Sequence, residues 1–159
     1  AYTRNRSQGL QDQFGPEYER AVGETGSRRE AEAELLERRT RYEELDIRPL
    51  PQDAAEAYAR EWQRVQAGFV DEPERSFVEA DRLVVAVMRD RGYPMGEFDQ
   101  RAADVSVDHP DVVEHYRAAH AVALEADRGR AETEDLRQGM VHYRALFEDL
   151  LDDHRSEVN

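Results

Sequence analysis

The 159-residue sequence contains no cysteine and no lysine. Without cysteine, disulfide bonds, thiol catalysis and thiolate metal sites are excluded, and the redox compartment stays open. All 22 basic residues are therefore arginine, whereas asparagine occurs twice and isoleucine once. A solvated helix surface accepts lysine as readily as arginine, so this composition indicates GC-rich codon usage and not a structural requirement.

The sequence also lacks the motifs that mark the common enzyme classes. Gly-x-Gly never occurs, which removes a glycine-rich phosphate loop, and no His-Glu-x-x-His is present. No histidine has an acidic residue three positions before it, which removes the di-iron bundle motif. No stretch approaches the ~20 apolar residues of a membrane span, and no signal peptide is visible. These absences favour a non-enzymatic function and predict neither a metal site nor a cofactor.

The chain has fewer basic than acidic residues. The chain carries 36 acidic residues and a formal net charge of −14. Nucleic acids and anionic membranes are polyanions, so this charge argues against both as partners. It is compatible with a basic protein partner, but we favour the simpler interpretation that the charge keeps the domain soluble.

The apolar residues that are present, 39% of the chain, recur with helical spacing, and no segment shows the alternation typical of a strand. We therefore expect an all-α fold. The strongest pattern is Leu136, Met140, Tyr143, Phe147 and Leu150, spaced 4, 3, 4 and 3. The expected helices cover 16–22, 27–45, 52–69, 73–91, 97–105, 110–128 and 134–152.

Several residues at the ends of these segments are typical of helix termini. Pro16 and Pro73 suit the first helical position. Ser27 and Glu30 have the spacing of a capping box. Gly92 lies where a left-handed C-terminal cap is expected. The run from Arg38 to Arg41 is interleaved with Glu, so we expect it to form a solvated face with intrahelical ion pairs.

We expect three parts along the chain. Residues 1–9 contain Arg4 and Arg6 but no acidic residue, and are predicted to be a disordered or juxtamembrane linker. Residues 10–46 are predicted to form a helical arm. Residues 52–155 are predicted to form the core domain, a bundle-like pack of four main helices, 52–70, 73–91, 110–128 and 134–152.

Four side chains are candidates for a ligand-binding site: Tyr116, His120, His142 and Tyr143. They lie on core-flanking faces of the last two long helices and could line a polar pocket between them. The alternative, which we favour, is that these rings are buried and form hydrogen bonds across the helix interface. His115 and His120 are five residues apart, on different sides of one helix, so they cannot easily share a metal ion.

The aromatic stripe Tyr58, Trp62 and Phe69 presents a similar choice. It could line a ligand groove, but aromatic residues at helical spacing more often belong to a core. We therefore expect these three side chains to pack inside the domain.

Seven segments together resemble a family of actinobacterial proteins of the Streptomyces type. They are Gln13-Phe-Gly-Pro-Glu-Tyr18, Ser27-Arg-Arg-Glu-Ala-Glu32, Leu45-Asp-Ile-Arg-Pro-Leu50, Arg91-Gly-Tyr-Pro94, Val107-Asp-His-Pro-Asp-Val112, His115-Tyr-Arg-Ala-Ala-His120 and Leu136-Arg-Gln-Gly-Met-Val-His-Tyr-Arg144. The resemblance runs from about residue 10 onward. It implies a membrane helix and basic residues before this acidic helical domain, and hence an anchor preceding Ala1. By the positive-inside tendency, Arg4 and Arg6 would then place the domain on the cytoplasmic side. No activity or catalytic residue is implied.

Two functions remain after these exclusions. The first is a non-enzymatic protein-interaction or scaffolding domain held at a membrane, which binds another protein or a second copy of itself through a helical groove or acidic face. The thin apolar stripe of helix 27–45 would suit such packing. The second is a small-molecule binding or sensing domain, or an enzyme without recognisable motifs, with its pocket near Tyr116, His120, His142 and Tyr143.

Overall fold

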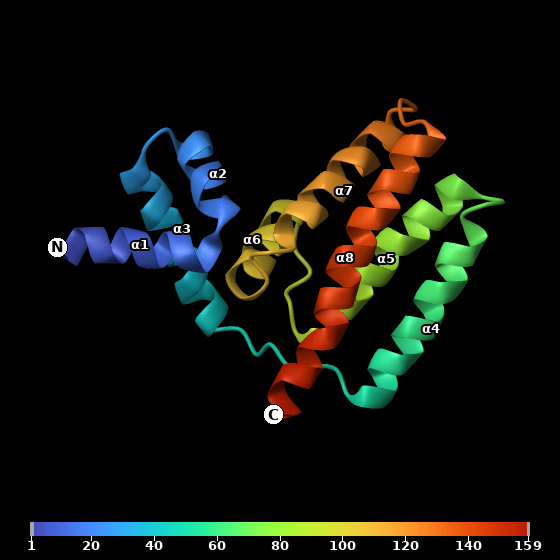
Figure 1. The fold of residues 1–159 in the computed structure, drawn as a ribbon, viewed down its shortest axis with the longest axis horizontal. Helices are drawn as coiled ribbons and strands as arrows, with labels where there is room; N and C mark the ends of the chain where they lie inside the picture. The colour runs from blue at the N-terminus through green and yellow to red at the C-terminus, as the bar shows by residue number, and fades with distance from the viewer. Residues whose placement is uncertain (1, 159) are drawn as a thin grey trace. The chain divides into compact units, whose positions relative to one another are not determined.

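The computed structural model describes the backbone of residues 2–158 and the side chains of residues 5–152. This part of the chain forms eight α-helices and no strand, which confirms the all-α class (Figure 1). The chain divides into two compact units. Unit 1 contains residues 1–46 and 94–114, and unit 2 contains residues 47–93 and 115–159.

Unit 1 is built from four helices: α1 (Tyr2–Phe14), α2 (Pro16–Thr25), α3 (Arg28–Glu43) and α6 (Phe98–Asp108). Its core is a single cluster to which each helix contributes apolar side chains. The buried members are Leu10, Phe14, Tyr18, Ala21, Ala31, Leu35 and Val107. Helix 27–45, now α3, therefore buries its thin stripe within its own chain and not against a partner.

Arg38 is part of this interior, so the prediction of a solvated arginine face is wrong at this position. Only 7% of Arg38 is exposed. Its guanidinium donates to Glu17 at 2.8 Å, to Ser106 at 3.0 Å and to Glu34 at 3.2 Å. A buried arginine is tolerated because carboxylates surround it, and the network joins α2, α3 and α6.

Two predicted boundaries differ in unit 1. The segment 1–9 was predicted to be disordered or a linker, but α1 is helical from Tyr2 onward. Leu10 and Phe14 anchor this helix in the core, and Ser7 donates a hydrogen bond to Glu32 at 2.7 Å. Residues 94–114, which were predicted to lie in the core domain, belong to unit 1 because α6 packs on α3.

Unit 2 contains the four main helices predicted from the sequence: α4 (Gln52–Gly68), α5 (Pro73–Arg91), α7 (Val113–Asp127) and α8 (Thr133–Val158). The first two residues of α7 precede the start of the unit. Helix α5 packs along α8 on one side and α4 on the other. The buried centre combines α5 and α8, and includes Phe77, Val84, Val87, Tyr143, Leu146 and Phe147.

The residues predicted to begin or end helices are mostly confirmed in those positions. The Ser27 side chain accepts a hydrogen bond from the Glu30 backbone N–H, and Pro16 and Pro73 occupy the first turns of α2 and α5. Gly92 ends α5 with a φ of 107°, the left-handed conformation that favours glycine. Helix α7 begins at Val113 and not at Pro110 as expected, because residues 110–112 form a turn.

Gly139 marks a close approach of α8 to its neighbours. A Cβ added at this position would lie 2.4 Å from Cε1 of Phe77 on α5 and 3.3 Å from Cγ1 of Val122 on α7. Three helices therefore meet at a point where no side chain fits. Among the described residues, no helix is both long and apolar enough to cross a membrane.

Candidate functional site

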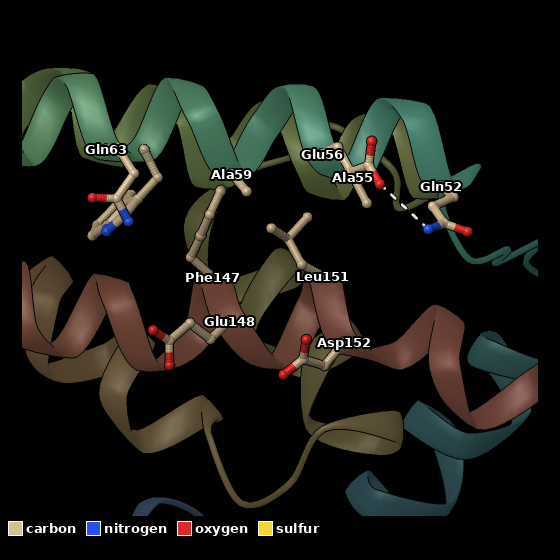
Figure 2. A pocket seen from close by; sticks show the side chains of 10 residues that line it. Gln52, Ala55, Glu56, Ala59, Gln63, Phe147, Glu148, Leu151 and Asp152 are labelled. Carbon is tan, nitrogen blue, oxygen red and sulfur yellow. Dashed lines mark hydrogen bonds between the residues drawn. The ribbon is translucent and has the colours of Figure 1, made fainter.

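A cleft between α4 and α8 is the candidate site of unit 2 (Figure 2). It has a volume of about 430 Å³ and is open on one side. The residues that line it are Gln52, Ala55, Glu56, Ala59, Trp62 and Gln63 from α4, and Phe147, Glu148, Leu151 and Asp152 from α8. The two helices thus supply both walls.

The apolar part of the cleft arises from unequal side chains on the two helices. On α8, Phe147 and Leu151 lie one turn apart and point toward α4 (Figure 2). On α4, the positions opposite them are Ala55 and Ala59, also one turn apart. Alanine leaves the space that a larger side chain would fill, so a hollow remains between the helices.

Trp62 closes the inner part of this hollow. Its ring stacks on Phe147 with the ring centres 4.9 Å apart and the planes 22° from parallel. Only 4% of Trp62 is exposed, and its indole N–H donates to Gln66 at 3.0 Å. The expectation that Trp62 belongs to the core is confirmed, although this residue also lines the cleft. Tyr58 and Phe69, which were expected beside it in the core, are only half-buried.

The rim of the cleft carries negative charge. Glu56, Glu148 and Asp152 are the ionisable residues among those that line it, and no arginine or histidine is among them. Glu56 accepts a hydrogen bond from Gln52 at 3.3 Å (Figure 2). The described part of the cleft therefore combines an apolar floor with a carboxylate rim.

The four residues predicted as a ligand site lie elsewhere in unit 2. Neither of the two clefts described in this unit, the α4–α8 cleft and a shallower one between α4 and α5, is lined by any of them. Tyr116 and Tyr143 are fully buried, and the Tyr143 hydroxyl donates to Asp81 at 2.7 Å. His120 and His142 are half-buried. The two tyrosines agree with the favoured alternative of buried rings, the two histidines do so only in part, and the ligand pocket stays a prediction.

His142 has a partner that the sequence did not suggest. Its Nδ1 lies 2.9 Å from Nδ1 of His115, which is on α7. The ring centres are 5.1 Å apart, close to the largest separation that this contact allows, so the two nitrogens face each other head-on. One ring donates an N–H to the lone pair of the other, a geometry that leaves no common point for a metal ion. Burial and the nearby His115 lower the pKa of His142 below its ordinary value.

A metal site has no other basis in the described residues. Within them, no three His, Asp or Glu side chains come together as a metal site would require. Structural zinc sites use four protein ligands and catalytic sites at least three. The described side chains thus offer no ligand set for such a metal.

Of the α4–α8 cleft, the sequence suggested only Trp62, in the alternative that its aromatic stripe lines a groove. A further signal was present in Ala55 and Ala59, four residues apart on the helix that carries Trp62. Their spacing places two small residues on one face, beside a large aromatic ring. Comparisons of the chain with protein-family models, with curated proteins and with solved structures found no match.

Proposed function

We propose that this chain is a non-enzymatic protein-interaction domain that binds an apolar segment of another protein in the α4–α8 cleft. The observation that carries the proposal is the hollow over Ala55 and Ala59, which is floored by Phe147 and Leu151 and open to solvent. An amphipathic helix that docks into a groove between helices is an established mode of peptide recognition. Bulky apolar side chains of such a segment would fill the hollow.

Three features favour binding over catalysis. The three carboxylates of the rim are exposed and spread over two helices, whereas a catalytic acid is usually desolvated. The walls belong to two helices of the unit's framework, which suits a preformed groove. The lining also provides both apolar area and polar edges, as protein interfaces do.

Helix α3 does not support an interaction function, since its apolar stripe is buried in unit 1. The cleft replaces it as the surface that a partner would cover. A membrane anchor preceding Ala1 remains a proposal that rests on the family resemblance alone. It would hold the cleft near a membrane and restrict its partners to proteins found there.

The test is a selection of ligands followed by a variant that blocks the cleft. A random peptide library displayed on phage is enriched on the full chain, and the selected peptides are measured by fluorescence polarisation. Ala59→Trp fills the hollow. Ala57→Trp places the same side chain on the same helix outside the cleft, because residues two apart point to different sides.

The proposal expects selected peptides to bind the natural chain and the Ala57→Trp variant alike, and to bind Ala59→Trp at least ten-fold more weakly. Circular dichroism of both variants establishes that they are folded. If the library yields no enriched peptide, or if the enriched peptides bind Ala59→Trp as well as Ala57→Trp, the cleft is not the docking surface.

A further inference from the structure

We infer that the occupant of the α4–α8 cleft is a basic amphipathic helix whose arginine or lysine side chains pair with Glu56, Glu148 and Asp152 while its apolar side chains fill the hollow. This inference rests on the proposed function, since it names the chemical class of the partner for the same cleft. It goes beyond that function because an apolar groove alone does not distinguish a basic partner from an acidic one.

The charges at the cleft carry the inference. Of the described residues that line the cleft, three are carboxylates and none is cationic. Both walls contribute, since Glu56 lies on α4 and the other two on α8. A helix seated between them is therefore flanked by negative charge on both sides, and an acidic occupant would be repelled on both sides.

The surrounding protein strengthens this selection. The whole chain carries a formal net charge of −14. Such a charge attracts a basic partner over several ångströms and repels acidic ones, so it raises the rate of association with the former. The same charge argues against a nucleic acid or an anionic membrane as the occupant.

The spacing of the side chains along each wall matches the period of a helix. On α8, Glu148 and Asp152 are four residues apart, as are Phe147 and Leu151 beside them. In a partner helix, residues four apart also lie on one face. One row of apolar side chains can therefore enter the hollow while a neighbouring row of basic side chains lies along the carboxylates. The cleft extends along α4 from Gln52 to Gln63, which corresponds to about three turns.

Glu148 already has an intramolecular partner. Arg144 donates to Glu148 at 2.8 Å, and both side chains are more than half exposed, at 56% and 57%. Exposed pairs of this kind contribute little, so a partner cation can replace Arg144 at small cost. At Glu148, a partner cation therefore replaces an exposed ion pair and not a buried one.

The test uses three synthetic helical peptides of about four turns with identical leucine positions, spaced 4 and 3. The positions that flank the leucines carry arginine in the first peptide, glutamine in the second and glutamate in the third. Binding to the full chain is measured by isothermal titration calorimetry. The arginine peptide is then titrated into Glu56→Gln/Glu148→Gln/Asp152→Asn, and into Glu74→Gln/Glu125→Gln/Glu134→Gln, which removes the same charge from residues outside the cleft.

Three exposed pairs, each worth a factor of roughly 1.5 to 5 in affinity, predict that the arginine peptide binds about ten-fold tighter than the glutamine peptide. Its advantage should decrease in high salt. The cleft variant should lose most of this advantage and the control variant little of it.

Equal binding of the arginine and glutamine peptides would overturn the basic occupant while leaving an apolar docking cleft intact. The basic occupant is also overturned if both charge variants weaken the arginine peptide equally, because the attraction would then come from overall charge. If none of the three peptides distinguishes the natural chain from Ala59→Trp, the docking function fails as well.

Discussion

Replacing Gly139 by alanine should destabilise unit 2, although the same change stabilises most helices. Glycine in a helix interior costs up to about 1 kcal/mol relative to alanine, so propensity alone predicts a gain. The structure opposes that gain, because the new Cβ would lie 2.4 Å from Cε1 and 3.0 Å from Cζ of Phe77. The ring would have to move.

The ring has little room to move. Phe77 is 2% exposed and is packed against Tyr143, with ring centres 5.2 Å apart. Overpacking a buried site costs about 1–3 kcal/mol. After the gain in helix propensity, we expect the free energy of unfolding to fall by up to about 2 kcal/mol, and Tm to fall by about 2–4 °C for each kcal/mol lost in a chain of this size.

The single tryptophan provides the assay. Trp62 lies in unit 2 and stacks on Phe147, so its emission follows the unfolding of this unit in urea. The control is the same substitution in a Phe77→Leu background, where the smaller side chain should remove the clash and leave Gly139→Ala neutral or stabilising. The reasoning is refuted if Gly139→Ala raises the urea midpoint in the natural background.

Four further substitutions test other parts of the structure. Ser27→Ala removes the N-cap of α3 and should cost about 1 kcal/mol, measured by thermal unfolding followed by circular dichroism. Arg38→Met removes the cation beside buried Glu17 and should cost about 3–5 kcal/mol, with faster hydrogen exchange in α2 and α3; an unchanged exchange rate would contradict the network. Because the pKa of His142 is lowered in the folded chain, the unfolded chain binds a proton at this histidine more readily. The contribution of His142 to stability is therefore present above about pH 6.5 and is lost as the pH is lowered. His142→Gln should reduce the decrease in urea midpoint between pH 7 and pH 5. Burial and the hydrogen bond to a neighbouring aspartate raise the pKa of Tyr58 to about 12. The contribution of Tyr58 to the free energy of unfolding is therefore complete below about pH 10 and is lost as the pH rises above it. Tyr58→Phe should make the free energy of unfolding less dependent on pH in this alkaline range.

The four helices of unit 2 could be predicted from the sequence because several local signals coincide there. The periodic apolar residues from Leu136 to Leu150 define a face of α8, while Pro73 and Gly92 mark the two ends of α5. Each of these patterns spans only a few residues, and the local preference for helix agrees with the tertiary packing. These helices therefore follow from the sequence to within three residues at each end, except that α8 continues beyond the predicted residue 152 to Val158.

The features that could not be predicted depend on contacts between distant segments. Residues 2–9 belong to a helix that is tied to the rest of unit 1, since Ser7 donates to Glu32 and Leu10 is buried. Arg38 looks like a surface residue until α2 and α6 provide its partners. The pairing of His115 with His142 requires two helices to be in register, and periodicity within one helix carries no information on that register.

The candidate site escaped prediction for a related reason. Periodicity locates large apolar residues, and Trp62 was correctly expected in the core. A cleft, however, is defined by space that side chains leave empty, and Ala55 and Ala59 are inconspicuous in a sequence rich in alanine. Whether such a gap is filled depends on the neighbouring helix, which is α8, at the other end of unit 2 in the chain.

The order of segments in the two units also has a consequence for biosynthesis. The chain begins unit 1, leaves it for α4 and α5, returns with residues 94–114, and finally completes unit 2. During translation, the apolar face of α5 emerges well before α8, its main packing partner, has been made. Unit 1 therefore cannot finish folding before residues 94–114 have emerged, and the core of unit 2 stays incomplete until α8 has left the exit tunnel.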